Sequence, residues 1–443
     1  MNTRFYVFIF ISLSIYASVD FNPDCFNTQD KSLNQYLKTA AYNNPELLSA
    51  FERWKAALEV ILEVNTLPDP QFSFSYFIVP IETRTGPQRA LFALEQTFPW
   101  MGKLKLKGQQ AYEAANMLRM EFEDMKLQIF YEVKKYYFEY AYLMQSISIT
   151  KENIRLLRYI EGVARDSYAA GNAQYADIIR AQVELGQLQD RLRSLEDYIK
   201  PIVAKLNAAM YLPSTQSLPQ PQLMRPVDMK ISQMELMNLL EQYNPKLQSL
   251  RYLENKESYA VRYAKKEYFP DFTIGFETIA TGAARTPGIS DSGKNPIIGK
   301  IAFNIPIWIN KRRASVNKSE MKKTAAKNER NGIKETLFAD LQLALYQYRD
   351  SIRKLNLYGD TLIPKAEEVL TILLKSFEVD TSNYLDLIDA ERTLLELQLA
   401  YERSLADQAQ VVARLETLVG TGVESTWKQR CSPVEIFKKI GVK

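Results

Sequence analysis

The sequence predicts a mainly helical protein with a small β part, built from one unit that occurs twice. Only 16 glycines and 19 prolines interrupt the 443 residues, so the chain has few turns and runs in long elements. Residues 168–185 (YAAGNAQYADIIRAQVEL) return near the other end as residues 377–394 (FEVDTSNYLDLIDAERTL). Self-similarity at this spacing indicates a duplicated unit of about 200 residues. In both copies a helical pattern stops at small or turn-forming residues and then resumes, which predicts one helical hairpin in each half.

The composition argues against several classes of function. The 56 basic and 52 acidic residues leave a net charge of only +4, and no basic block stands out, which gives little support to nucleic-acid binding. The chain has no histidine, so neither a histidine-based metal site nor the usual general base is available. No glycine-rich phosphate loop or nucleophile elbow occurs. We therefore expect no enzymatic activity, no metal site and no cofactor.

Residues 1–18 have the pattern of a secretory signal peptide. Arg4 precedes an apolar run over residues 5–16, and the small residues Ala17 and Ser18 follow it. The alternative is a membrane anchor, but the run is shorter than the roughly 20 residues of a spanning helix. No later stretch is long and apolar enough to span, so a mature chain that enters a membrane would do so with strands.

Cys25 and Cys431 are the two cysteines, and each lies in a tail beside the helical body. Export would bring both into an oxidising compartment. We hypothesise a disulfide that joins the two tails; the alternative is two unrelated thiols.

Two β-hairpins are predicted, at about residues 71–98 and 271–307. Each follows a helix that begins at an Asn-Pro pair, Asn44-Pro45 or Asn244-Pro245, and the apolar period then changes from 3.6 to 2. Strands of about ten residues match the length that a tilted strand needs to cross a membrane, although soluble hairpins are the alternative. Four strands cannot close a barrel and open edges are not tolerated in lipid, so membrane strands require several chains; three would supply twelve strands.

A long helix follows each hairpin, at residues 103–170 and 311–379. The first would be about 100 Å long at 1.5 Å per residue. Apolar residues at spacings of three and four predict coiled-coil packing, and Pro364 predicts a bend in the second helix. The shorter return helices are expected at 174–211 and 384–419. The chain then divides into a first repeat at 19–230 with a linker at 212–230, a second repeat at 231–420 and a tail at 421–443.

In this order the residues resemble the TolC family of outer-membrane efflux proteins. The resemblance covers nearly the whole mature chain and is carried by the doubled order of Asn-Pro helix, hairpin, junction (98–103, FPWMGK), long helix and Tyr-x-x-Gly turn. The junction is also similar to that of cation-efflux branches of the family. The implied fold is a TolC-like α-helical barrel of coiled-coil hairpins joined to a trimeric twelve-stranded transmembrane β-barrel. The linker at 212–230 and the tail at 421–443 would form an equatorial belt.

The resemblance implies a passive exit duct in the outer membrane of a Gram-negative-type cell, with most of the chain in the periplasm. The homotrimer would serve a tripartite efflux or type I secretion system, docked to a periplasmic adaptor (membrane fusion) protein and an inner-membrane transporter. The alternative is a periplasmic helical-hairpin adaptor or scaffold. An adaptor would need β-rich domains flanking a single helical hairpin, whereas here each of two hairpins has its own pair of strands. A soluble coiled-coil protein would leave the strands and the signal peptide unexplained.

The resemblance also implies a ring of acidic residues at the pore entrance. Asp386 and Asp389 stand at the ring positions after the second tip turn, while the first copy has Asp177 and, in place of the second aspartate, Arg180. Six carboxylates around a narrow mouth would favour cations. We hypothesise that Arg180 pairs with a neighbouring carboxylate in the closed state. The alternative is that the aspartates are solvated charges near helix N-termini, where the helix dipole favours them.

The tips themselves are the expected contacts with the adaptor. The candidate residues are Tyr168, Gly171, Phe377 and Asp380, the last of which stands where the first copy has its glycine. The alternative is that they are exposed turn residues without a partner.

Overall fold

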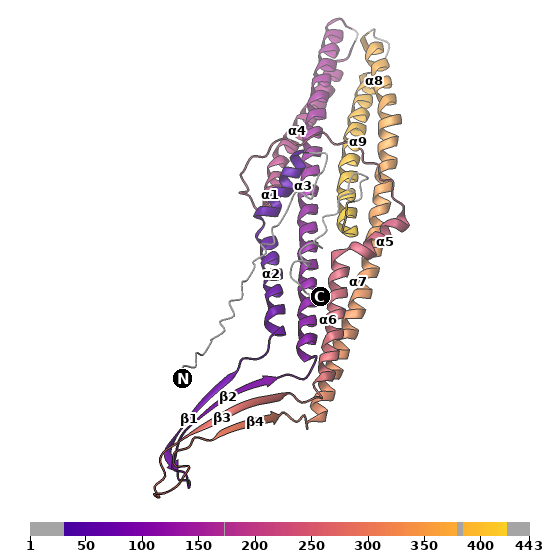
Figure 1. Cartoon of the computed structure of the whole chain (residues 1–443). Helices are drawn as coiled ribbons and strands as arrows, with labels where there is room; N and C mark the ends of the chain where they lie inside the picture. The colour runs from indigo at the N-terminus through magenta and orange to yellow at the C-terminus, as the bar shows by residue number, and fades with distance from the viewer. Residues whose placement is uncertain (1–30, 172, 379–383, 423–443) are drawn as a thin grey trace.

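The computed structural model of the chain describes residues 31–171, 173–378 and 384–422. The molecule is elongated, with a small sheet at one end and the far ends of the hairpin helices at the other (Figure 1). The predicted signal peptide at 1–18, the two cysteines Cys25 and Cys431, and Asp380 of the second tip lie outside the described residues.

The first half begins with two short helices. Helices α1 (Lys31–Asn43) and α2 (Pro45–Asn65) precede strands β1 (Gln71–Ile81) and β2 (Gln88–Phe98), and α3 (Lys103–Ala169) and α4 (Tyr175–Ala209) form the first hairpin. The Asn44 side chain caps α2 by accepting hydrogen bonds from the N–H groups of Glu46 and Leu47. Gly102 turns the chain from β2 into α3 with a φ of 88°, a conformation that favours glycine.

The second half repeats this order with α5 (Gln233–Tyr243), α6 (Pro245–Lys266), β3 (Phe272–Thr281) and β4 (Ile297–Phe303). Its hairpin is formed by α7 (Ile309–Leu357), α8 (Ile363–Glu378) and α9 (Tyr384–Val419). The prediction that the last strand runs to about residue 307 is wrong. Pro306 has no N–H for a ladder, and at Asn304 the side-chain oxygen accepts the hydrogen bond from the Asp271 N–H, while the Asn304 N–H donates to the Asp271 carbonyl.

The prediction of one continuous helix over 311–379 is also wrong, because a π-helical turn, η2 (Tyr358–Leu362), separates α7 from α8. This turn lies just before Pro364, which cannot donate an intrahelical hydrogen bond and whose ring crowds the carbonyl four residues earlier. The Ile363 N–H donates to the carbonyl of Tyr358, five residues back. Gly359 leaves room for the Tyr401 ring of α9, since a Cβ at this glycine would lie 2.9 Å from that ring. The sequence thus locates the interruption but not its form.

The four strands form one antiparallel sheet in the order β1-β2-β3-β4. The register places Phe72 opposite Leu94, and Leu94 opposite Phe276, so these apolar side chains share one face and are exposed there. The other face carries Glu95 and Lys300, whose carboxylate and ammonium lie 2.7 Å apart. The period-2 pattern therefore produces a sheet with one apolar and one polar face.

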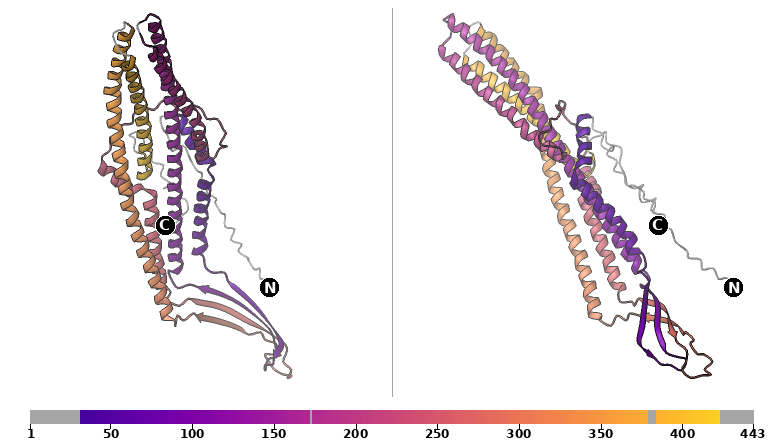
Figure 2. Two further views of the ribbon diagram at one scale, coloured as in Figure 1. Left: turned by 180° about the vertical axis from the view of Figure 1, so that it is seen from behind. Right: turned by 90° about the vertical axis from the view of Figure 1, so that its left-hand side faces the viewer.

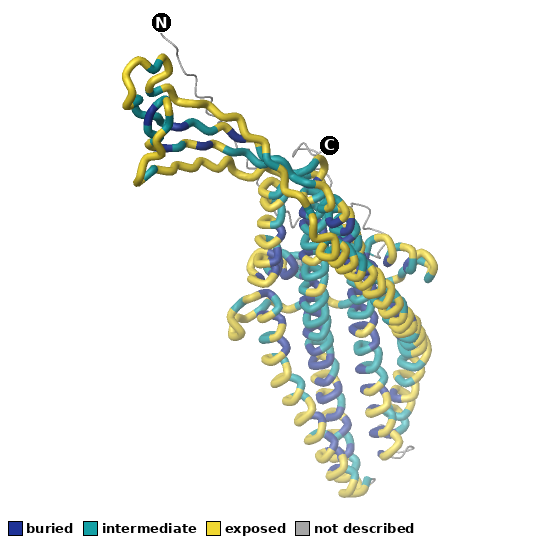
Figure 3. The backbone as a smooth tube through the Cα atoms, turned by 90° about the horizontal axis from the view of Figure 1, so that it is seen from below, coloured by how far each residue is buried: buried dark blue, intermediate teal, exposed yellow. Residues whose placement is uncertain are grey.

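Helix α3 is the centre of the helical part. It packs against α2 and α4 of its own half and against α6 and α9 of the second half. The two further views show the hairpins side by side and the sheet bending away from them (Figure 2), and buried residues follow the facing sides of the helices (Figure 3). The described part of the chain contains no helix whose length and hydropathy would let it cross a membrane.

Candidate functional site

Each hairpin tip carries a pair of aromatic rings that face each other across the turn. The ring centroids of Tyr168 and Tyr175 lie 5.7 Å apart, and those of Phe377 and Tyr384 are separated by the same distance. Gly171, with a φ of 82°, reverses the chain in the first tip. Of the proposed adaptor contacts, Tyr168 and Gly171 are exposed, whereas Phe377 is buried in the core of the bundle. The duplication seen in the sequence thus places a similar pair of aromatic rings at each tip, while Tyr168 is exposed and its counterpart Phe377 is buried.

The four residues predicted at the entrance all lie in the first two turns of a return helix. Asp177 completes a capping box, because its carboxylate accepts a hydrogen bond of 3.3 Å from the Gln174 N–H. Arg180 lies 3.4 Å from the same carboxylate, one turn along α4. Asp386 and Asp389 are exposed at the start of α9. The first copy thus pairs its acidic residue locally, while the second presents two aspartates to solvent.

An ion pair connects the two hairpins close to these positions. The Arg392 guanidinium on α9 lies 2.7 Å from the Glu184 carboxylate on α4 and 3.8 Å from Asp389. The paired residues are separated by 208 positions in the sequence, so no local pattern could indicate that they meet. This contact makes the return helices of the two halves neighbours near the tips.

Glu391, beside this ion pair, is the most unusual side chain of the tip region. It is completely buried, and neither of its carboxylate oxygens has a hydrogen-bond partner. Burial and then repulsion from Glu184 raise its pKa to about 7, against the opposing effect of Arg392. The sequence does carry a signal for this burial, because Glu391 occupies the buried row of α9 that includes Tyr384, Ile388 and Leu395. A carboxyl group within an apolar stripe at helical spacing marks a buried charge.

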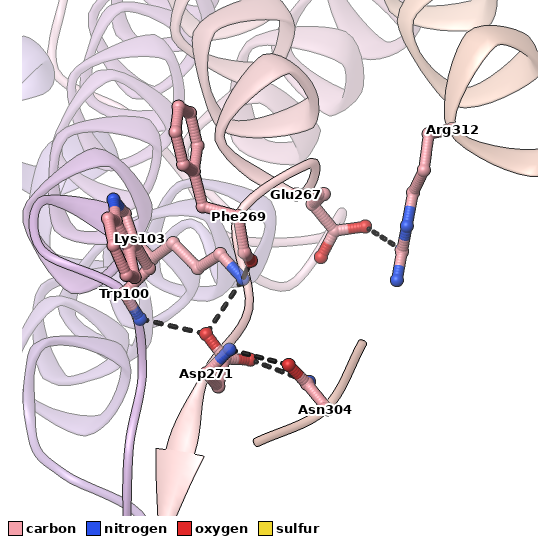
Figure 4. A network of polar contacts seen from close by, with 7 residues as sticks. All are labelled: Trp100, Lys103, Glu267, Phe269, Asp271, Asn304 and Arg312. Carbon is pink, nitrogen blue, oxygen red and sulfur yellow. Dashed lines mark hydrogen bonds and ion pairs between the residues drawn. The ribbon is translucent and has the colours of Figure 1, made fainter. Parts of the chain in front are cut away.

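A second polar cluster lies at the opposite end of the helices, where the strands begin (Figure 4). The Asp271 carboxylate accepts hydrogen bonds from the Lys103 ammonium at 2.7 Å and from the backbone N–H of Trp100 at 2.8 Å. The Asn304 amide donates to the other carboxylate oxygen, at 3.3 Å, and Lys103 also donates to the Phe269 carbonyl. Burial acts to raise the pKa of Asp271, but the Lys103, Trp100 and Asn304 hydrogen bonds outweigh it, so the pKa lies below its usual range. We call this cluster the junction network.

The junction network joins the two halves of the chain. Lys103 begins α3 of the first half, whereas Asp271 and Asn304 flank the strands of the second half. The Trp100 ring stacks on Phe269, with centroids 5.2 Å apart and planes 13° apart. In the same region the Arg312 guanidinium of α7 lies 2.8 Å from Glu267, at the end of α6 (Figure 4). The FPWMGK motif thus supplies the Trp and Lys that hold the second half in place.

The match to a known family lies in the second half of the chain. Residues 236–421 match the sequence profile of the family described as outer membrane efflux protein. The second half of the chain is thus similar to this family, as the sequence resemblance predicts. The family's description agrees with the outer-membrane location that the sequence resemblance implies and names no enzymatic activity.

Two relatives match this chain over most of its length. The cobalt-zinc-cadmium resistance protein CzcC of Cupriavidus metallidurans is 20% identical over 401 residues, which cover 88% of this chain and 90% of the relative. Nodulation protein T of Rhizobium leguminosarum is 20% identical over 417 residues, covering 89% and 86% of the two chains.

Its fold is that of solved outer-membrane channels. The outer membrane protein VceC of Vibrio cholerae superposes with a TM-score of 0.70 at 17% identity, covering 89% of this chain and 98% of that one. The predicted fold class, TolC-like and mainly helical with a small β part, is thereby confirmed.

Proposed function

We propose that three copies of this chain form a passive exit duct through the outer membrane, docked at the hairpin tips to a periplasmic adaptor and through it to an inner-membrane pump. Within each chain, residues 19–230 and 231–420 would act as two similar repeats. Most of each chain would lie in the periplasm. The family and the fold support an efflux duct in general terms, and the assembly is inferred from the geometry below.

The observation that carries the proposal is the four-stranded sheet with two free edges. Strands β1 and β4 are the edges, and one face of the sheet is apolar and exposed. An open edge is not tolerated in lipid, because its N–H and C=O groups would have no hydrogen-bond partner. Since the four strands alternate in direction, β4 of one chain would lie antiparallel to β1 of the next, so copies can continue the ladder until it closes.

The solutes that pass would be selected at the entrance. Asp386 and Asp389 of three chains would surround the mouth with carboxylates, and a narrow opening with walls of low dielectric constant concentrates the field of such charges. We expect the duct to favour cationic over anionic solutes. The relative CzcC is named a cobalt-zinc-cadmium resistance protein, which is compatible with such a preference.

Cysteine cross-linking of the sheet edges tests the assembly. In a chain with Cys25 and Cys431 replaced by serine, Ser73 in β1 and Ala302 in β4 would be changed to cysteine, since both lie on the polar face. Oxidation of the membrane-embedded protein should give covalent dimers and trimers and no larger species. Each single-cysteine variant should give no cross-linked dimers or trimers, because the contact between β1 and β4 then contains only one thiol. Monomers alone from a series of such pairs along β1 and β4 would refute the proposal.

A further inference from the structure

Glu391 is a buried carboxyl group that has no role in the proposed duct. Its side chain is 0% exposed, and both carboxylate oxygens lack a hydrogen-bond partner. The Tyr384 hydroxyl, two helical turns earlier on α9, is also buried without a partner. Two unpartnered polar groups in one helical row are costly, because each has lost its water without gaining a protein partner.

The charged groups around Glu391 do not neutralise it. Glu184 approaches from α4 and repels it, while Arg392 on its own helix attracts it. The Arg392 guanidinium, however, makes its hydrogen bonds to Glu184. From α3 and α4, Glu161 and Asp177 add negative charge at the neighbouring Tyr384. The facing residues of α8 in this cluster are apolar, among them Leu370 and Phe377.

The Glu391 carboxyl group is stable in these surroundings only in its protonated form. Ionisation would place a negative charge in an apolar core beside Glu184, and the structure offers it no donor. The protonated acid is neutral and can remain in the row between Ile388 and Leu395. The pKa of Glu391, raised to about 7, reflects the same preference for the protonated form.

We propose that Glu391 is a proton-binding site that couples the packing of the two hairpins near the entrance to the proton concentration around the tips. With the proton bound, α9 packs against α3 and α4 as in the structure. When the proton leaves, the carboxylate must reach water, so α9 loosens from the first hairpin and strains the Glu184–Arg392 pair. The link to the entrance rests on the proposed duct, whereas the proton site itself does not.

The direction of the pH effect follows from the two protonation states. Packed, the group binds its proton with a pKa of about 7; exposed, it has the ordinary value of 4.5. The packed state is therefore favoured below pH 4.5, and this advantage is lost as the pH rises through 7. Between pH 5.5 and 8 the equilibrium for local opening should increase about 30-fold, since each pKa unit is a factor of ten.

Amide hydrogen exchange of the detergent-solubilised full-length protein tests the proposal, read from peptides covering residues 384–399 and corrected for the intrinsic pH dependence of exchange. Wild type should lose protection about 30-fold between pH 5.5 and 8. Glu391→Gln, which keeps the shape of the neutral acid, should show no such loss. Glu396→Gln is the matched control, because Glu396 is exposed on the same helix and should leave the 30-fold change intact. A pH-independent wild type, or a Glu391→Gln variant that still responds, would overturn the proposal.

An infrared measurement keeps the idea testable if Glu391→Gln folds poorly. The carbonyl stretch of a protonated carboxylic acid should be present in wild type at pH 6 and disappear by pH 8. Its persistence at pH 8 or its absence at pH 6 would contradict a proton site that titrates near neutrality. A solubilised monomer that shows both pH effects would support the proton site while refuting the duct, so the two failures are distinguishable.

Discussion

Removing the Asp271 carboxylate should destabilise the protein more than removing any exposed ion pair. In Asp271→Ala the Lys103 ammonium, whose side chain is only 6% exposed, would keep one acceptor, the Phe269 carbonyl at 3.0 Å. The Trp100 N–H would lose its acceptor as well. Breaking a buried ion pair by removing one partner costs about 3 to 5 kcal/mol. Because the Asp271 side chain is 24% exposed, we expect the lower end, about 3 kcal/mol.

The pair between Lys265 and Glu320 provides a matched control. It links α6 to α7, but its atoms lie 3.5 Å apart and its side chains are 61% and 46% exposed. Glu320→Ala should therefore cost less than about 1 kcal/mol. Denaturant unfolding in detergent, followed by tryptophan fluorescence, measures both variants through the shift of the midpoint at constant slope. Equal shifts for the two variants would refute the view that the junction network holds the halves together.

The same network predicts a response to acid. The folded-state pKa of Asp271 lies below its ordinary value of 3.8. The contribution of the carboxylate is therefore present above pH 3.8 and is lost as the pH falls through the lower folded-state pKa. Asp271→Asn should abolish this part of the acid sensitivity, and an unchanged acid unfolding profile would contradict the assignment.

Three further outcomes are expected. Replacing both Asp386 and Asp389 by alanine should lower the ratio of cation to anion permeability in planar bilayers, and an unaltered ratio would argue against the acidic entrance. Asn244→Ala removes the cap of α6 and a 2.8 Å hydrogen bond to a carbonyl of α9, and should cost about 1 to 2 kcal/mol in denaturant unfolding. Gly359→Ala should cost about 1 to 3 kcal/mol because its Cβ would lie 2.9 Å from an α9 ring. Gly332→Ala, with nothing within 4 Å, should instead stabilise α7 by up to about 1 kcal/mol, and equal effects at both glycines would contradict the packing at the π turn.

Local patterns were sufficient to predict most elements of the fold. The Asn-Pro pairs mark the starts of α2 and α6 because asparagine caps a helix and proline fits its first position. The alternating strands reveal their two faces because side chains in a strand point alternately to opposite sides. These features depend on neighbours within a few residues, so the sequence displays them directly.

What escaped prediction depends on contacts between distant residues. Lys103 and Asp271 are 168 residues apart, and nothing in the junction motif indicates which carboxylate the lysine meets. The π turn at Tyr358–Leu362 reflects how the helix accommodates Pro364 while the Tyr401 ring packs on Gly359, and this requires α9 to be in place. The entrance assignment of Asp177, Arg180, Asp386 and Asp389 stays a prediction, because it concerns charges from several chains.

The mass of the particle extracted from the outer membrane tests the central claim most directly. Light scattering in detergent, corrected for bound detergent, should give three times the mass of the mature chain, and the particle should conduct ions in planar bilayers. A particle with the mass of one chain that produces no conductance would contradict the account.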